Sequence, residues 1–172
     1  MALPDVSLAR GSTESADRRP EALHWSAENC TLGRAMDILG EKWTILVLRE
    51  LFVGIRRFED LRVRANIPRQ VLTNRLARLV EHGLVRRHPY QEPGARTRDE
   101  YRLTEKGLDL YPVLASILAW GDRYLGDPDG PPLELRHRDC GAPIRVELRC
   151  EAGHLSVPRD VLPTPGPGLR AR

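Results

Sequence analysis

The sequence predicts a mainly helical α+β fold, and three observations carry that prediction. Apolar residues recur at helical spacing along most of residues 29–125, and glycine or proline separates the repeats. One turn-rich stretch, 91–99, lies between two short segments typical of strands, which predicts a β-hairpin. A chain of 172 residues is long enough for one packed domain with additions and short for two full domains.

Composition divides the chain into five segments. Residues 1–24 mix proline, serine, glycine and charge without a period, so we expect a disordered arm. The main domain is expected over 25–125, followed by a linker rich in proline, glycine and aspartate over 126–132. A small β extension over 133–162 and a disordered tail over 163–172 complete the expected organisation.

Two helices are expected at the start of the main domain. Apolar residues at i, i+3, i+4 and i+7 predict a helix over about 30–39 that ends at Gly40. The next segment, 43–52, is apolar on nearly all sides and ends at Gly54. A helix without a polar face is buried, so this one is predicted to lie at the centre of the core.

Two further helices follow, joined by a short turn. The first is expected over 58–65, with two acids in its first turn, where the helix dipole favours them, and Asn66 provides the turn. Pro68 suits the first position of the second helix because its missing N–H is not needed there, and Gly83 ends that helix. Opposite its leucine stripe, this second helix carries a polar face of hydrogen-bond donors, namely Gln70, Thr73, Asn74, Arg75 and Arg78.

The remainder of the main domain is expected to be a hairpin and a helix. Strands are predicted over 84–90 and 100–103. Thr104 can cap the helix that runs to Leu125, and Pro112 inside that span predicts a bend or break near Leu108.

Positive charge is concentrated in one part of the chain. The net charge is only +3 and the pI is about 9.0, which by themselves do not indicate a nucleic-acid ligand. From Arg56 to Arg102, however, there are 12 arginines and 6 acids, so this segment carries +6 and the remainder −3. An arginine-rich coding composition is the alternative explanation of these arginines.

The order of elements in this basic segment is that of a winged helix-turn-helix. A helix fits the major groove of DNA, where arginine can bond guanine and asparagine or glutamine can bond adenine, while flanking arginines meet phosphates. The alternative is a solvated helix face beside a charged loop. The candidate DNA contacts are Arg69, Gln70, Thr73, Asn74 and Arg75 in the groove, Arg96 and Arg98 on the wing, and Arg57 on the flank.

Several linked motifs carry a family resemblance: GEKWTILVLREL at 40–51, RRFEDL at 56–61, IPRQVLTNRLARLVEHGLV at 67–85 and EYRLTEKGLDLYPVL at 100–114. From about Cys30 to Leu125 the chain resembles the HxlR-type family of winged-helix transcriptional regulators, relatives of the MarR regulators. The resemblance implies a homodimer, paired through its first and last helices, that binds a pseudo-palindromic operator. It also implies a recognition helix through 70–75 and a wing tip over 92–98. Pro68 departs from the capping serine of many members.

The three cysteines receive separate interpretations. An odd number of cysteines, with no signal peptide evident, argues against a disulfide framework. Cys30 stands at the start of the first expected helix, where the helix dipole and Arg34 would favour a reactive thiolate. It lies twelve residues before Lys42, as does the cysteine of family members that sense quinones or oxidants. A redox sensor and a merely buried thiol are the two interpretations.

The C-terminal extension carries four candidate metal ligands in an H-x2-C and C-x3-H arrangement. Such a set can hold tetrahedral zinc and fold a segment that is too short for its own core. The pattern resembles an extension of one HxlR subgroup, usually H-x2-C-G and C-x2-C-G, but here the last ligand is displaced. The alternative to a zinc-ribbon-like extension is a β-hairpin with a degenerate knuckle in which the cysteines are buried. The candidate ligands are His137, Cys140, Cys150 and His154.

These observations favour a homodimeric, sequence-specific regulator of transcription, with repression favoured over activation and a small molecule or oxidant as effector. No phosphate loop, catalytic triad or carboxylate pair marks an active site, so we do not expect an enzyme. The rival functions are a winged-helix module that binds an acidic protein partner and a zinc-dependent enzyme built on the extension. Apolar runs are too short for a membrane span or a signal peptide, so we expect a cytoplasmic protein.

Overall fold

The structure is a computed structural model that describes residues 28–170. The arm expected over 1–24 lies outside the described residues. The chain divides into two units, and the second of them covers residues 31–164. The helices and strands of the described chain all belong to the second unit.

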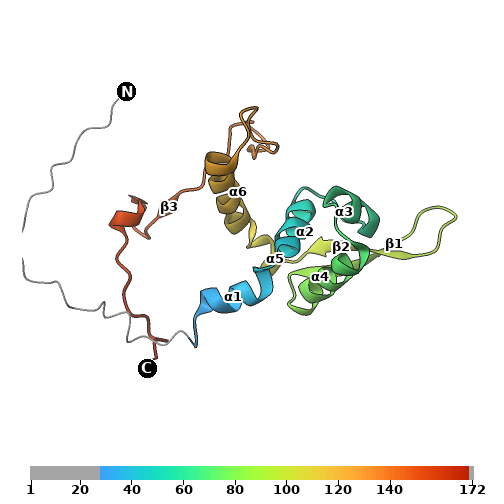
Figure 1. The fold of residues 1–172 in the computed structure, drawn as a ribbon, viewed down its shortest axis with the longest axis horizontal. Coiled ribbons are helices and arrows are strands. Elements are labelled where there is room, and N and C mark those ends of the chain that lie inside the picture. Colours follow the sequence, from blue (N-terminus) through green and yellow to red (C-terminus); the bar gives the residue numbers. More distant parts are fainter. Residues whose placement is uncertain (1–27, 171–172) are drawn as a thin grey trace, which may run out of the picture. The chain divides into compact units, whose positions relative to one another are not determined.

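The second unit is mainly helical, with one long antiparallel hairpin and a second hairpin of two-residue strands (Figure 1). The helices α3 and α4 follow a central helix, and the longer hairpin follows α4 directly. In order, the elements are α1 (Thr31–Leu39), α2 (Lys42–Phe52), α3 (Phe58–Arg64), α4 (Arg69–Glu81), β1 (Val85–Tyr90), β2 (Arg98–Leu103), α5 (Glu105–Leu108), α6 (Tyr111–Leu125), β3 (Leu148–Arg149) and β4 (Leu155–Ser156).

The helical pattern in the sequence is confirmed by this structure. The break expected near Pro112 separates α5 from α6, and Pro112 lies in the first turn of α6. Thr104 caps α5, because its hydroxyl accepts a hydrogen bond from the Gly107 N–H at 3.1 Å.

Two predicted boundaries are wrong by one or two residues. Pro68 is the N-cap of α4 rather than its first residue, and no side chain caps this helix start. β2 begins at Arg98 and not at Glu100, because the ladder extends outward as far as a pair between Tyr90 and Arg98. Arg98 therefore lies on a strand, at the edge of the loop that we expected to contain it.

The core forms around α2, as its apolar composition predicts. Leucines from α2, α3 and α4 meet there with almost no exposed surface, and Val85 of β1 joins them. Burying a leucine side chain stabilises the fold by about 1.5–3 kcal/mol, so these contacts fix α3 and α4 relative to α2. The most deeply buried leucines are Leu48, Leu61, Leu72, Leu76 and Leu79.

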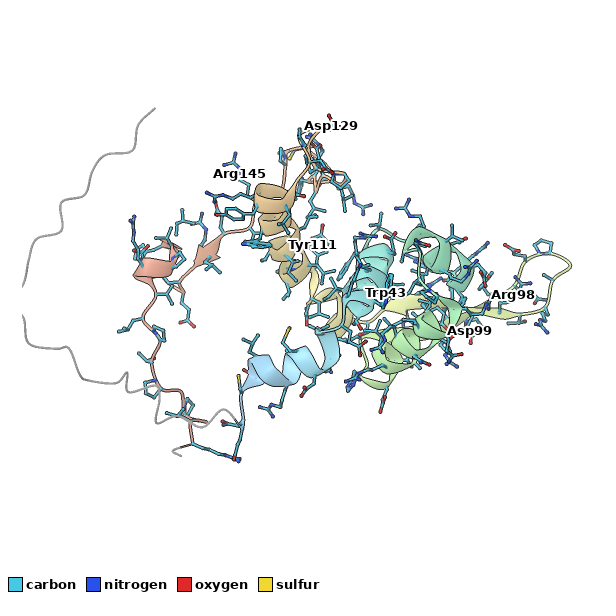
Figure 2. All side chains as sticks on the ribbon, in the orientation of Figure 1. Trp43, Arg98, Asp99, Tyr111, Asp129 and Arg145 are labelled. Atoms are coloured by element: carbon cyan, nitrogen blue, oxygen red, sulfur yellow. The ribbon has the colours of Figure 1, made fainter. Side chains whose placement is uncertain are left out.

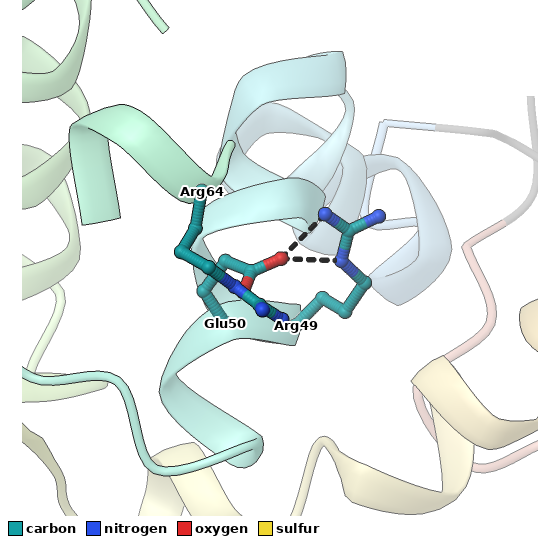
Figure 3. Close-up of polar contacts among 3 residues, drawn as sticks. All are labelled: Arg49, Glu50 and Arg64. Carbon is teal, nitrogen blue, oxygen red and sulfur yellow. Dashed lines mark hydrogen bonds and ion pairs between the residues drawn. The ribbon is translucent and has the colours of Figure 1, made fainter. Parts of the chain in front are cut away.

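A buried carboxylate links α2 to α3 (Figure 3). The Glu50 side chain is only 2% exposed and accepts hydrogen bonds from Arg49 Nε at 2.8 Å and Arg64 Nε at 3.1 Å. A buried carboxylate requires such partners, since an isolated buried charge is strongly unfavourable. This cluster holds the first helix of the helix-turn-helix against the core.

The base of the hairpin is tightly packed. Thr104 N donates to the Leu84 carbonyl at 3.1 Å, and Lys106 Nζ donates to the His82 carbonyl at 2.8 Å. Gly107 lies so close to the Leu84 backbone that a Cβ built on it would be 2.1 Å from the Leu84 carbonyl oxygen. Only glycine fits here, so α5 can pack directly on the chain that enters β1.

The C-terminal extension has little regular structure. Leu148 pairs with Ser156 and Arg149 with Leu155, which gives a hairpin of two-residue strands. A second turn is closed by Ile144 N, which donates to the Leu135 carbonyl at 2.8 Å.

Across residues 28–170, none of the helices combines the length and apolarity needed to span a bilayer.

Candidate nucleic-acid interface

The turn between α3 and α4 fixes the direction of α4. Asn66 has a φ of +48°, a left-handed conformation that asparagine tolerates better than most residues. Next to it, buried Ile67 donates its N–H to the Arg62 carbonyl at 3.1 Å and anchors the turn in the core. Because the leucine stripe of α4 faces the same core, its opposite face is exposed.

Two amide side chains lie one turn apart on this exposed face. Gln70 Nε2 donates to Asn74 Oδ1 at 3.0 Å. Thr73 is also exposed, and its hydroxyl donates to the Arg69 carbonyl at 3.0 Å. This pairing leaves the amide oxygen of Gln70 as an acceptor and the amide nitrogen of Asn74 as a donor. The two groups suit the donor and acceptor pattern of adenine in the major groove.

Arg69, at the start of α4, has a side chain that is 68% exposed. Its guanidinium pairs with Glu59 of α3 and lies 5.2 Å from the centre of the Phe58 ring. Glu59 also accepts a hydrogen bond from Arg62 Nε at 2.7 Å. In the described structure, Glu59 therefore balances part of the positive charge at this end of α4.

The arginines around Glu59 make its carboxyl group more acidic. The hydrogen bond from Arg62 and the positive charges of Arg69 and Arg62 lower the pKa of Glu59 below its ordinary value of 4.5. Because the folded pKa is depressed, the ion pairs stabilise the fold above pH 4.5 and lose this effect as the pH falls through the folded pKa.

We expect Glu59→Gln to reduce the acid sensitivity of the fold. Below pH 4.5 the free energy of unfolding should fall less steeply for the variant than for the natural chain, since the variant has no carboxylate to protonate. Urea unfolding at a series of pH values measures this. Glu81→Gln, at an exposed residue that makes no ion pair in the described structure, is the control. Equal acid slopes for Glu59→Gln and the natural chain would contradict the expectation.

Arg75 lies differently from its expected place in the groove. Its side chain is only 17% exposed, and it pairs with Glu41, just before α2. Arg78, also expected on the outer face, turns back and donates to the Asp37 carbonyl. Both arginines brace α4 against the α1–α2 region, which helical spacing alone could not reveal because it ignores the length of an arginine side chain.

The hairpin forms a wing that Arg57 ties to the helix-turn-helix. Arg57 Nη1 lies 2.7 Å from Glu92 Oε1, and its guanidinium carbon lies 4.7 Å from the centre of the Tyr90 ring. Its backbone also bridges to Glu100 of β2. Sequence reasoning placed Arg57 on the flank but missed Glu92 as its partner, which required knowing how the wing folds back.

The tip of the wing carries the remaining candidate contacts. The loop is closed by Gln91 Nε2, which donates to the Ala95 carbonyl at 2.9 Å. Arg96 on this loop and Arg98 at the start of β2 are both exposed. Figure 2 shows Arg98 beside Asp99 on the hairpin. The two arginines are therefore free to contact an anionic ligand surface that also lies against α4.

The candidate zinc ligands come together only as two pairs. Cys140 Sγ lies 3.4 Å from His137 Nδ1, and Cys150 Sγ lies 3.5 Å from His154 Nδ1. Nowhere in the described chain do three or more histidine, cysteine or acidic side chains form a group that could hold a metal. A structural zinc site needs four ligands around one ion, and this arrangement does not provide them. Zinc binding therefore stays a prediction from the sequence that this geometry does not support.

Cys30, the candidate redox residue, is exposed and directly precedes α1. Cys140 and Cys150 are exposed as well, which does not agree with a knuckle that buries its cysteines.

Comparison with known proteins gives consistent matches over the helix-turn-helix. The model of the HxlR-like helix-turn-helix family matches residues 38–129. An uncharacterised HTH-type transcriptional regulator of Mycobacterium tuberculosis is 46% identical over 146 residues, which cover 84% of this chain and 91% of the relative. A regulator of the same description from Synechocystis is 39% identical over 97 residues, 56% of this chain and 70% of the relative.

Solved structures match in the same way. The crystal structure of a candidate transcription factor covers 80% of this chain and 95% of its own length, with a TM-score of 0.71 and 33% identity. A second candidate transcription factor, from Pseudomonas aeruginosa, covers 81% of this chain and 94% of its own, with a TM-score of 0.56 and 33% identity.

Proposed function

Because the chain belongs to the HxlR-like helix-turn-helix family of transcriptional regulators, we propose that it places α4 in the major groove of a pseudo-palindromic operator as a homodimer. The observation that carries the proposal is the exposed face of α4, where Gln70 and Asn74 hold each other's amides one turn apart. Amides fixed in this way meet a base with less loss of side-chain freedom than free ones. The expectation that the chain is not an enzyme is confirmed, since its family and relatives are regulators.

Within this proposal the candidate residues take different roles. Gln70, Thr73 and Asn74 read bases, and Arg69 exchanges Glu59 for a phosphate or a base. Arg96 and Arg98 lie along the backbone or in the minor groove, and Arg57 holds the wing in place. Arg75 acts by bracing α4 rather than by direct contact. An acidic protein partner is the less favoured ligand, because exposed arginines stand where an apolar patch would favour protein binding.

The exposed apolar side chains of α6 and α1 support the homodimer. Val113, Trp120 and Tyr124 follow helical spacing along one side of α6, and all three are exposed. On α1, Leu32 and Met36 are exposed one turn apart. Large apolar side chains grouped on a helix face are typical of an interface.

We propose repression as the regulatory outcome and the cytoplasm as the site of action, where the operator would be bound. A dimer bound at an operator would compete with the transcription machinery for the same DNA. A response to a small molecule or to an oxidant through Cys30 stays a prediction.

We expect Arg98→Ala to weaken binding to matched and scrambled duplexes alike. The arginine is proposed to neutralise a backbone phosphate, a contact that carries no sequence information. The slope of log affinity against log salt should become less steep by about 0.9 for each copy of the chain. Fluorescence anisotropy titrations at several salt concentrations measure both effects. Arg138→Ala, at an exposed arginine of the C-terminal extension, is the control and should leave the slope unchanged. A loss confined to the matched duplex would make Arg98 a base reader instead.

A further inference from the structure

One apolar pocket of the main domain has no part in the interface with DNA. Its volume is about 360 Å³, near the lower end of the range of about 300–1,000 Å³ found for small-molecule sites. α2 and α6 form two of its walls, and the chain just after the linker forms a third. Its apolar lining includes Ile45, Phe52, Leu114, Leu118, Leu133 and Leu135.

The pocket lies on a different side of α6 from the stripe proposed for the second copy. By steps of 100° per residue, Leu114 and Leu118 lie roughly 120° around the helix from Val113, Trp120 and Tyr124. Ile117 borders both sides. A partner chain seated on the stripe therefore leaves most of the pocket lining uncovered.

Two charged residues line the pocket, and they are not equivalent. Arg49 is held in place by Glu50, which receives hydrogen bonds from Arg49 Nε and Nη2 (Figure 3). No hydrogen bond uses its Nη1 within the described residues. Asp122 makes no ion pair in that part of the chain, so no cation holds its carboxylate there.

The cluster behind Arg49 carries a net positive charge. Arg49 and Arg64 share the single carboxylate of Glu50, so two cations face one anion. Glu50 is buried, whereas the Arg49 side chain is 42% exposed and is the part of the cluster that lines the pocket. A guanidinium that is already oriented and has an unused N–H edge is suited to bind a carboxylate or sulfonate.

The same cluster connects the pocket with the helix-turn-helix. Glu50 lies between Arg49 at the pocket and Arg64 on α3, the first helix of that motif. An anion bound at the unused Nη1 edge of Arg49 shares the positive charge of the guanidinium with Glu50. The carboxylate then depends more on Arg64, which changes how α3 is held against α2.

We propose that this pocket binds a small, mostly apolar molecule with one anionic group, and that Arg49 binds the anion and relays its presence to α3 through Glu50. The relay rests on the proposed DNA-binding function, whereas the site itself does not. Binding of such an effector weakens operator affinity, because the link between α2 and α3 sets the position of α4.

Two fluorescent probes that differ in one group test the site on the full chain. Anilinonaphthalene sulfonate has an aromatic body and an anionic group, and phenylnaphthylamine has the same body without the anion. We expect Arg49→Gln to weaken binding of the sulfonate about fivefold or more, the scale of a lost charge-assisted hydrogen bond, and to leave the neutral probe unaffected. Arg123→Gln, at an exposed arginine of α6 outside the pocket, should change neither.

Two further variants separate the role of the cavity from the role of the charge. Leu118→Trp is designed to fill the pocket while Arg49 itself stays unchanged, and it should weaken both probes. If melting curves show that Arg49→Gln does not fold, Arg49→Lys takes its place. This variant keeps the charge and tests whether the guanidinium itself is needed to bind the sulfonate. The site is overturned if Leu118→Trp leaves both probes unchanged, if Asp122→Asn rather than Arg49→Gln weakens the sulfonate, or if probe binding falls as the protein concentration rises and a second copy covers the pocket.

The relay is tested by operator titrations with and without saturating sulfonate probe. We expect the probe to lower operator affinity about fivefold, the lower end of ordinary allosteric coupling, and Arg49→Gln to abolish this effect. An unchanged affinity in the natural chain overturns the relay but not the site. A natural chain that binds no operator overturns the proposed function, and the fluorescence result still decides the pocket.

Discussion

Asn74→Ala is expected to lower affinity for the matched operator by roughly tenfold or more, and to leave affinity for a scrambled duplex nearly unchanged. A bidentate amide contact with a base contributes about 1–3 kcal/mol of discrimination, and a dimer would lose it at two half-sites. The variant also removes the acceptor that holds the Gln70 amide at 3.0 Å, so Gln70 loses its orientation.

Titration of both duplexes by fluorescence anisotropy checks this expectation. Because Gln70 and Asn74 act together, the double variant with Gln70→Ala should lose less than the sum of the two single losses. Arg98→Ala is the matched contrast, since it should weaken both duplexes. Equal losses on matched and scrambled DNA for Asn74→Ala would assign Asn74 to the phosphate backbone and would leave the base reader unidentified.

Among glycine-to-alanine substitutions in the described chain, Gly107→Ala is expected to cause the largest loss of stability. The new Cβ would lie 2.1 Å from the Leu84 carbonyl oxygen, and backbone cannot move aside as a flexible side chain can. Overpacking of this kind costs about 1–3 kcal/mol, and each kcal/mol lowers the melting temperature of a chain of this size by about 2–4 °C. Since Leu84 leads into β1, the wing should be displaced as well.

Thermal unfolding followed by circular dichroism measures the effect, and Gly121→Ala is its control. Gly121 also lies in a helix, but a Cβ there meets nothing within 4 Å. Alanine is the better helix former by about 0.5–1 kcal/mol, so this variant should be as stable as the natural chain or more so. If the two variants melted alike, the close approach of α5 to Leu84 would not constrain position 107.

Local sequence signals were enough to predict the helices and the hairpin. The apolar spacing of 43–52 identified the central helix, and Pro112 identified the break between α5 and α6 because its effects act on the nearest residues. The exposed amides of α4 followed from the position of its leucine stripe. All of these features depend on residues within two or three turns of each other.

Features that depend on the path of the chain were not predictable in the same way. Glu50 reads as an ordinary charged residue until α3 brings Arg64 beside it, and no local pattern shows that a carboxylate will be buried. The pairing of Arg75 with Glu41 likewise needs the crossing of α4 over the start of α2. The zinc prediction rested on ligand spacing and on a family resemblance, and the described chain brings the four ligands together only as two pairs.

The start of α4 has a consequence for how this protein meets its ligand. Pro68 precedes the helix, no side chain caps it, and its first turn contains no acid, so no side chain of the described residues accepts a capping hydrogen bond from the first amides of α4. In the proposed complex a phosphate oxygen of the operator would occupy that position and act as the missing cap. The first turn of α4 would then exchange its amide hydrogens quickly in the free protein and slowly on DNA, and the DNA itself would complete the fold of the element that reads it.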